Sequence, residues 1–185
     1  YGFQDLFVNN KSPESLLIET GISNLKFISS AGDNPGSANI DPDHVKKIIS
    51  FIKKLNADTV ILDLGPGTSF NVLDFFNIST RSIAMSSPEI TSVMKTFSFI
   101  RSALFRRISQ HLKDLPNLQK LVDHSKHLKT DLETYSVDTL RKNISTIDDS
   151  QTKQINQIIE KFKPSIIINR VRSKKDLLAG NNIAN

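Results

Sequence analysis

The chain has 185 residues, of which 38% are hydrophobic, so it is long enough to bury the core of one domain. It contains no cysteine, which excludes disulfides and thiolate metal sites and favours the reducing cytoplasm. The formal net charge of +5 is concentrated, because residues 95–129 hold eight Lys and Arg against two Asp. No apolar run approaches the roughly 18 residues of a membrane span, and the first residues do not read as a signal peptide. We therefore expect one cytoplasmic domain with a single basic face.

The first predicted elements are a strand and an amphipathic helix. Residues 25–29 form a short apolar run followed by a loop of Ser, Gly, Asp and Pro, which predicts a buried strand. A helix is predicted next, with Asp41 as its cap and Pro42 at its first position. The apolar residues of this helix recur at helical spacing: Val45, Ile48, Ile49, Ile52 and Leu55.

Three further apolar segments predict strands. Residues 59–63 run without alternation into a carboxylate and a Gly-Pro-Gly turn, which indicates a parallel strand covered on both faces. Residues 82–86 and 165–169 repeat this pattern, and helical segments separate them, including a long helix over about 89–112. Strands that alternate with helices imply right-handed crossovers. The expected fold class is therefore α/β, with a mainly parallel sheet and helices on both faces in three layers.

Residues from about 104 to 150 are longer than one crossover requires and carry no strand signal. We interpret them as a helical insertion at the edge of the sheet, within a single domain over residues 1–185. The helix that leads into the insertion has an apolar stripe that we expect to face the sheet: Phe97, Ile100, Leu104, Ile108 and Leu112. Its aromatic residues Phe97, Phe99 and Phe105 are then core residues, and Arg106 and Arg107 point outward.

Ligands of parallel α/β sheets bind beyond the carboxyl ends of the strands, so the residues after each predicted strand are the candidate site. The first strand ends at Asp63, and Gly65, Pro66 and Gly67 follow it. An acidic residue in this place can hold Mg²⁺, and the glycines allow the backbone to approach a ligand closely. A structural alternative, a tight turn with Asp63 capping the next helix, is favoured on spacing alone.

Two other strand ends carry polar residues. Pro88 and Glu89 follow residues 82–86, although Ser87 as a cap with Pro88 at the first helical position would explain them as helix initiation. Asn169 and Arg170 end the last strand. An Asn side chain has one acceptor and two donors, enough to recognise a purine edge, but it can equally close a turn.

In their order and spacing, VILDLGPGTSFNVLDFF, SSPEITSVMKTFSFIRSALFRR and IIINRVRSKKD resemble the MinD/ParA family of P-loop ATPases. The resemblance is closest to the MinD-like branch that includes the flagellar-number regulator FlhG, and it runs from about residue 3 to the end of the chain. It implies a P-loop type fold, ATP and Mg²⁺ as cofactors, slow hydrolysis, and an ATP-dependent homodimer that positions flagella, a division site, a chromosome or a large complex. Asp63 corresponds to the acidic residue that ends the Walker B strand and contacts the hydration shell of Mg²⁺.

The resemblance also implies the nucleotide contacts. Gly65 and Gly67, with Pro66 between them, match the switch that senses the γ-phosphate. Asn169 matches the Asn that contacts adenine in the family, and Arg170 lies beside it. Pro88 and Glu89 match a Pro-Glu pair that lies near the nucleotide pocket and the dimer face in the family.

Three family features are missing from the sequence. No Gly-Lys-Ser or Gly-Lys-Thr occurs, so the KGGVGK-type loop that binds phosphates is absent. The first switch and the amphipathic carboxyl-terminal helix, which would supply membrane contact, are absent as well. We expect that the sequence lacks its ends, and natural loss of the loop is the alternative. The second functional hypothesis is accordingly a non-hydrolysing interaction domain, and the third is a nucleic-acid-binding regulator.

Two charged groups suggest further partners. His124 and His127 lie three residues apart and could present two imidazoles to a metal, although a solvated basic face is favoured. The basic segment over residues 95–129 is expected to meet an acidic surface. We favour a protein partner or the second subunit over DNA, because its residues lack the regular stripe of a groove-binding helix.

Overall fold

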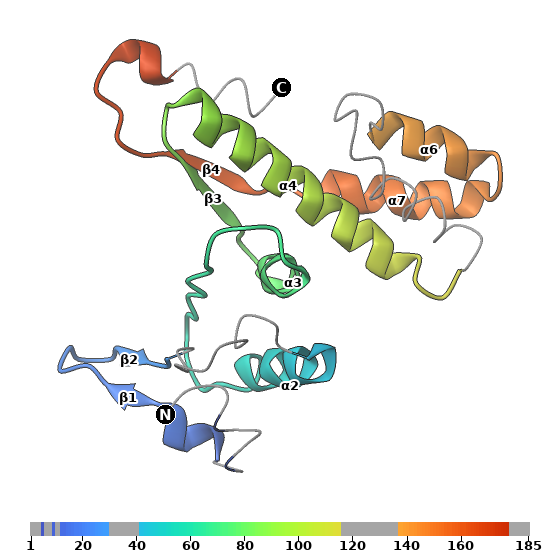
Figure 1. Cartoon of the computed structure of the whole chain (residues 1–185). Helices are drawn as coiled ribbons and strands as arrows, with labels where there is room; N and C mark the ends of the chain where they lie inside the picture. The colour runs from blue at the N-terminus through green and yellow to red at the C-terminus, as the bar shows by residue number, and fades with distance from the viewer. Residues whose placement is uncertain (1–4, 6–8, 10–11, 30–40, 116–136, 178–185) are drawn as a thin grey trace. The chain divides into compact units, whose positions relative to one another are not determined.

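The computed structural model describes residues 5, 9, 12–29, 41–115 and 137–177 (Figure 1). Two compact units divide the chain, Tyr1–Asp63 and Leu64–Asn185. Within the described residues the fold is mixed α/β, with five α-helices and two small sheets, one antiparallel and one parallel. Short 3-10 helices span Pro13–Leu16 and Lys174–Leu177. The expectation of one domain over residues 1–185 with a helical insertion stays a prediction.

The first unit contains a short antiparallel hairpin where residues 25–29 were expected to form a buried strand. Strand β1, Ile18–Glu19, pairs with β2, Lys26–Phe27, and both strands are exposed. The turn uses left-handed backbone at Gly21, with φ of 77°, and at Asn24, with φ of 63°. The prediction of a buried strand is wrong here. The segment pairs with β1 across a short turn and not within a larger sheet, so both of its faces stay exposed.

Helix α2, Pro42–Ile52, begins where the sequence predicts. The backbone N–H of Asp43 donates to Oδ1 of Asp41 at 2.8 Å, which confirms the cap. Val45 and Ile48 of the predicted apolar stripe are buried.

Residues 59–63 form no strand, so this prediction is wrong. Val60 is 41% exposed and Ile61 is 86% exposed. A strand needs a hydrogen-bonded neighbour, and no strand of the described part of the chain pairs with this segment. Helix α3, Phe70–Ile78, has Ser69 at its N-cap, so Asp63 does not cap it either.

The second unit is built on two parallel strands (Figure 1). Strands β3, Ile83–Ser86, and β4, Ser165–Ile168, confirm the strands predicted over 82–86 and 165–169. Helix α4, Ile90–His111, packs against β3 and confirms the long helix predicted over 89–112. The face toward α4 is covered, since Ala84 and Ser86 are buried. The opposite face exposes apolar side chains: Ile83 at 54%, Met85 at 62% and Ile167 at 45%.

Helix α4 does not turn its predicted apolar stripe toward the sheet. Phe99 and Ala103 face α3 instead, and the Phe99 ring meets the Phe76 ring edge-on with centroids 4.9 Å apart. Phe97, expected in the core, is 46% exposed. Periodicity indicates which residues of α4 share a side, but it does not show which neighbouring element that side contacts.

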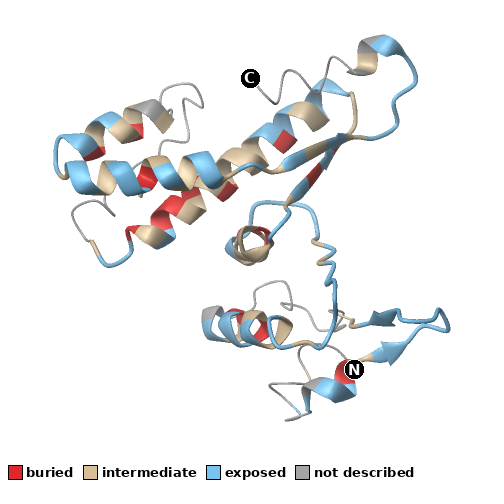
Figure 2. Cartoon of the chain, turned by 180° about the vertical axis from the view of Figure 1, so that it is seen from behind, coloured by how far each residue is buried: buried red, intermediate tan, exposed pale blue. Residues whose placement is uncertain are grey.

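The carboxyl-terminal half of α4 packs with two later helices, α6, Val137–Ser145, and α7, Asp149–Lys161. Figure 2 shows buried residues gathered along this part of the unit. The buried members of this helical core are Phe105, Ile108, Leu112, Leu140, Ile144 and Ile155. The described part of the segment predicted as helical, residues 104–150, is thus helical and carries its own core.

Asp148 caps α7 and is expected to make the stability of this helix depend on pH. Its Oδ1 accepts from the Ser150 hydroxyl at 2.6 Å and from the N–H of Ser150 and Gln151. These bonds, with the Ser150 hydroxyl first, lower the pKa of Asp148 in the folded state. The ionised cap therefore stabilises the fold above the unfolded carboxyl pKa of about 3.9. This stabilisation is lost as the pH falls through the lowered folded pKa.

Thermal unfolding of wild type and Asp148→Asn across this pH range tests the cap. Wild type should be the more stable protein at neutral pH, and the difference should shrink as Asp148 becomes protonated. Asp149→Asn is the matched control, since it removes a charge from the same turn and leaves the cap in place. A difference between wild type and Asp148→Asn that is constant with pH would contradict the prediction.

Candidate functional site at the carboxyl ends of β3 and β4

The parallel pairing of β3 and β4 joins two of the three predicted strand ends. Ser86 lies opposite Ile168, and the backbone N–H of Asn169 donates to the Ser86 carbonyl at 2.8 Å. The turns that carry residues 88–89 and 169–170 therefore leave the sheet at the same edge. This edge contains the carboxylate of Glu89 as well as the amide of Asn169 and the guanidinium of Arg170.

Serine side chains hold the turn between β3 and α4. The Ser92 hydroxyl accepts from the Ser87 N–H at 2.9 Å and lies 3.1 Å from the Ser86 hydroxyl. The Ser87 hydroxyl donates to Oε2 of Glu89 at 2.9 Å, and Glu89 itself occupies the N-cap. The expected start with Ser87 as cap and Pro88 at the first helical position is therefore wrong. Sequence analysis missed this cluster, although a serine in the first turn of α4 was its signal.

The turn after β4 is tight and polar. Oδ1 of Asn169 accepts from the Arg170 N–H at 2.8 Å, and Arg170 has left-handed backbone with φ of 60°. Asn169 thus closes a turn, as one interpretation of the sequence anticipated. Only its carbonyl oxygen makes this bond, and the two amide donors are the atoms that would recognise a purine edge.

The chain after this turn is fixed by Asp176. Its Oδ2 accepts from the backbone N–H of Arg172 at 2.8 Å and of Ser173 at 3.0 Å. These bonds lower the pKa of Asp176, with the Arg172 N–H the largest contribution. The ionised carboxylate thereby holds residues 172–176 in a defined loop next to the candidate site.

Asp63, which was predicted to end a third strand, is exposed. Asp63 belongs to the first unit, so its place beside the β3–β4 edge stays a prediction. Gly67 has φ of 107°, a conformation that requires glycine. A Cβ atom added at Gly65 or Gly67, on either side of Pro66, would meet nothing within 4 Å, so the backbone is open to a ligand at both glycines.

Metal ligands do not gather in the described residues. No group of three His, Cys, Asp or Glu side chains there could hold a metal ion. Asp63 by itself could supply a single Mg²⁺ ligand, either directly or through a water molecule. His124 and His127, the other candidate pair, lie outside the described residues.

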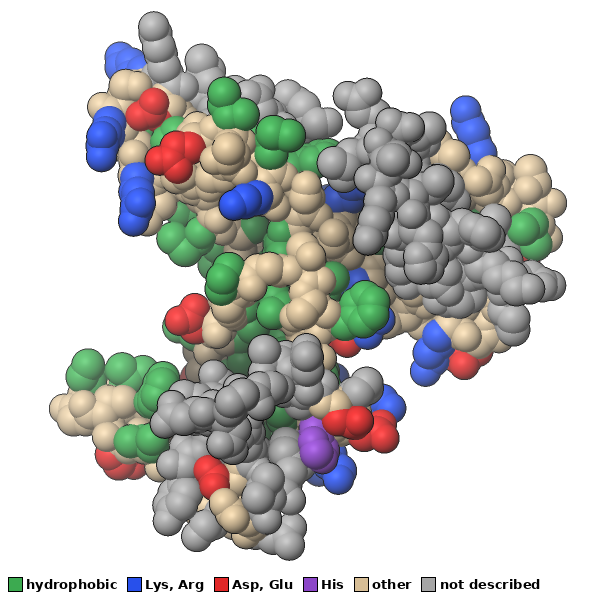
Figure 3. All heavy atoms as spheres, viewed as in Figure 1, with side chains coloured by type: hydrophobic (Ala, Val, Ile, Leu, Met, Phe, Trp, Pro, Cys, Tyr) green, Lys and Arg blue, Asp and Glu red, His purple; other side chains and the backbone are tan. Residues whose placement is uncertain are grey.

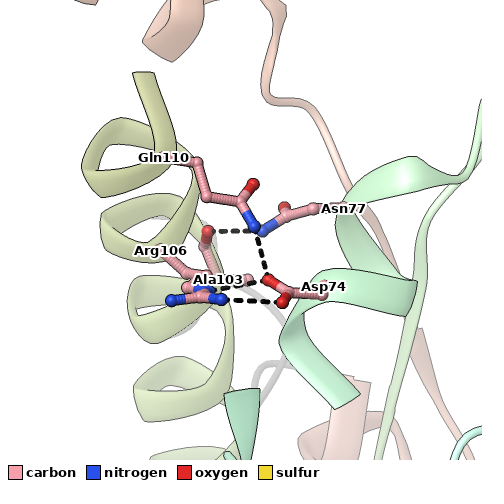
Figure 4. A network of polar contacts seen from close by, with 5 residues as sticks. All are labelled: Asp74, Asn77, Ala103, Arg106 and Gln110. Atoms are coloured by element: carbon pink, nitrogen blue, oxygen red, sulfur yellow. Dashed lines mark hydrogen bonds and ion pairs between the residues drawn. The ribbon is translucent and has the colours of Figure 1, made fainter. Parts of the chain in front are cut away.

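The basic face differs from its prediction at Arg106 (Figure 4). Nε and Nη2 of Arg106 donate to the two carboxylate oxygens of Asp74 on α3, each at 2.7 Å. Gln110 donates to the same carboxylate at 2.6 Å, and the Arg106 guanidinium lies 4.4 Å from the Phe70 ring centroid. Arg106 therefore points into the α3–α4 contact and not outward, because Asp74 offers a planar acceptor for both donors. Three of the basic residues, Lys120, Lys126 and Lys129, lie outside the described residues.

No family model, curated protein or solved structure matches the chain. Among the helices that the structure describes, none combines the length and apolar character that crossing a bilayer requires.

Proposed function

We propose that the chain is a domain of a cytoplasmic MinD/ParA-type ATPase that binds ATP with Mg²⁺ and hydrolyses it slowly. Its nucleotide cycle would control a homodimer and thereby position a cellular structure. The observation that supports this best is the parallel pairing of β3 and β4, because the Asn169 to Ser86 hydrogen bond makes the turns that carry residues 88–89 and 169–170 leave the sheet at the same end. The resemblance requires these two motifs to meet beside one nucleotide.

The proposed fold is the three-layer, mainly parallel sheet of P-loop ATPases. The exposed face of the β3–β4 pair supports it, since Ile83, Met85 and Ile167 form an apolar sheet surface. Parallel sheets normally bury both faces under helices.

Each candidate residue has a chemical role in this proposal. Asp63 would hold the hydration shell of Mg²⁺, and Gly65 and Gly67 would let the backbone sense the γ-phosphate. Asn169 would select adenine with its amide donors, while Arg170 would lie beside it. Residues 88–89 would contact the nucleotide or the second subunit.

The second candidate function is a non-hydrolysing interaction domain with the same sheet. The absence of Gly-Lys-Ser and Gly-Lys-Thr favours it, because no loop in this sequence neutralises a triphosphate. In either case the remaining basic residues of the 95–129 face would meet a protein partner. DNA binding is less well supported, since Arg106 is held by Asp74.

The chain alone is expected to bind adenosine and Mg-ATP with similarly low affinity. Both ligands offer the same base to Asn169, and this sequence contains no phosphate-binding loop that would strengthen binding of the triphosphate. NMR titration should therefore shift amide signals of residues 86–89 and 169–170, and Asn169→Ala should remove most of the shift. Asn143→Ala, in α6, is the matched control.

Two results would contradict this proposal. Absence of any shift at residues 86–89 and 169–170 would remove the adenine site. Micromolar affinity for Mg-ATP by calorimetry would show that the chain neutralises the phosphates by itself.

A further inference from the structure

The turn that carries Asn169 and Arg170 lies on the surface of the second unit. Every side chain from 169 to 174 is exposed, including Val171 at 38%, so no buried apolar contact fixes this stretch. Figure 3 shows charged side chains of both signs at the surface where this segment lies, at the upper left of the view. The conformation of the turn therefore depends on its backbone hydrogen bonds and on the groups that accept them.

Arg170 gives this turn a strained backbone. Its φ of 60° lies in the left-handed region, which a residue with a side chain adopts at a cost in free energy. The hydrogen bond made in this conformation is local, from the Arg170 N–H to Oδ1 of Asn169 at 2.8 Å. Strain of this kind persists only where the surrounding structure holds the segment in place.

The two ends of the turn are held by different groups. At the start, the Asn169 N–H donates to the Ser86 carbonyl and joins the turn to β3. At the far end, Oδ2 of Asp176 accepts from the N–H groups of Arg172 and Ser173. Asp176 is the third residue of the short 3-10 helix that follows, and it reaches back to the residue before that helix, as the acidic residue of a capping box does. One carboxylate oxygen thus closes the far end of the turn.

We propose that Asp176 is a positioning residue for the nucleotide site, because it holds the turn in which Asn169 keeps its two amide donors available to a ligand. Without the carboxylate, the far end of the turn is released and Arg170 can leave the left-handed region. The bond from the Arg170 N–H to Asn169 is then lost, and the Asn169 amide is free to rotate. This role rests on the proposed adenine site, whereas the orientation of Asn169 exists without any ligand.

Offsetting nearby positive charge is a different role that a carboxylate could have in this loop. Arg172 and Lys174 are exposed and lie close to Asp176 in the chain. Replacing both Asp176 and Lys174 by Ala restores the net charge of the loop but not the hydrogen-bond acceptor. This double variant therefore separates the two roles.

NMR of the full 185-residue chain without ligand tests the positioning directly. In Asp176→Ala, the N–H groups of Arg172 and Ser173 should exchange with solvent roughly tenfold faster or more, because both lose a charged acceptor. The side-chain amide signals of Asn169 should shift as well. Asp176→Glu should keep the wild-type values, since Glu is the usual acceptor in a capping box. Lys174→Ala is the matched control on the same short helix and should change neither measurement.

Adenosine titration measures the consequence for the proposed site. The dissociation constant should rise roughly fivefold or more in Asp176→Ala, because apparent affinity falls with the fraction of molecules in the binding-competent conformation. Asp176→Glu should restore the affinity, and Lys174→Ala should leave it unchanged, since adenosine carries no phosphate. Thermal unfolding of all three variants should match wild type, which separates positioning of Asn169 from a general loss of stability.

Several results would overturn the proposal. Unchanged exchange at Arg172 and Ser173 with an unchanged Asn169 amide signal in Asp176→Ala is one. Recovery of both in Asp176→Ala combined with Lys174→Ala is another, since only the charge is restored there. A shifted Asn169 amide with unaltered adenosine affinity would equally show that the turn does not position the site. If wild type bound no adenosine, the proposed nucleotide site would fail, and the ligand-free comparison would still decide whether Asp176 orients Asn169.

Discussion

Replacing Arg106 with Glu is expected to lower the free energy of unfolding of the second unit by about 3 kcal/mol. Arg106 and Asp74 are only 22% and 14% exposed at their side chains, and two donors of the guanidinium meet both carboxylate oxygens. A glutamate would place a second carboxylate against Asp74. The side chain of Gln110 would then be the main hydrogen-bond donor to the Asp74 carboxylate. It would also remove the cation from the face of Phe70.

Urea unfolding with amide hydrogen exchange measures this effect where it arises. Protection should fall in α3 and α4, while α2 in the first unit serves as an internal reference. Lys95→Glu is the control, because it makes the same charge change at an exposed position of α4. Asp74→Asn combined with Arg106→Gln should recover part of the loss, since two neutral amides need less solvation than an unpaired charge. If Arg106→Glu were no more damaging than Lys95→Glu, the basic residue would belong to the surface after all.

Leu140→Ala is expected to cost about 3 kcal/mol in the same unit. Leu140 on α6 is fully buried in the helical core, and its truncation leaves a cavity among Phe105, Ile144 and Ile155. The neighbouring helices can relax only in part, so both the lost transfer free energy and the cavity contribute. Loss of protection should spread through α6, α7 and the carboxyl-terminal half of α4.

Lys142→Ala is the control for this substitution, because Lys142 is exposed on the same helix. It should change stability by about 0.5 kcal/mol at most. A Leu140→Ala protein as stable as the control would mean that α6 does not pack on α4 and α7 in solution.

Elements with local signals were predictable from the sequence. Asp41 followed by Pro42 fixed the start of α2, and the apolar runs over 82–86 and 165–169 matched β3 and β4. Local signals were insufficient where a distant partner decides the outcome. Residues 59–63 have the composition of a buried strand, yet pairing depends on a neighbour that composition does not name.

Only one part of the candidate site was predictable from the sequence, namely that the residues after β3 and after β4 lie at the same end of the sheet. Parallel pairing of β3 with β4 brings Asn169 to Ser86, as the strand-end rule anticipates. The bonds of the Ser92 hydroxyl and the Asp74 to Arg106 pair were missed, because each depends on which helix face meets which neighbour. Charge counting treated Arg106 as surface, since a sequence shows the number of charges but not the carboxylate that faces each one.

The chain has two methionines, and both are exposed, Met85 at 62% on the open face of the β3–β4 pair and Met94 at 60% on α4. Oxidation converts a thioether into a polar sulfoxide, and exposed sulfur reacts before covered sulfur. The oxidation rate of Met85 thus shows whether the open face of the β3–β4 pair is covered, and the oxidation rate of Met94 shows the same for α4. Mild peroxide treatment with mass spectrometry can distinguish the two, so the unmodified protein already carries a chemical label for each surface. The same chemistry makes both surfaces sensitive to oxidative damage, because a sulfoxide at either position would oppose whatever apolar contact forms there.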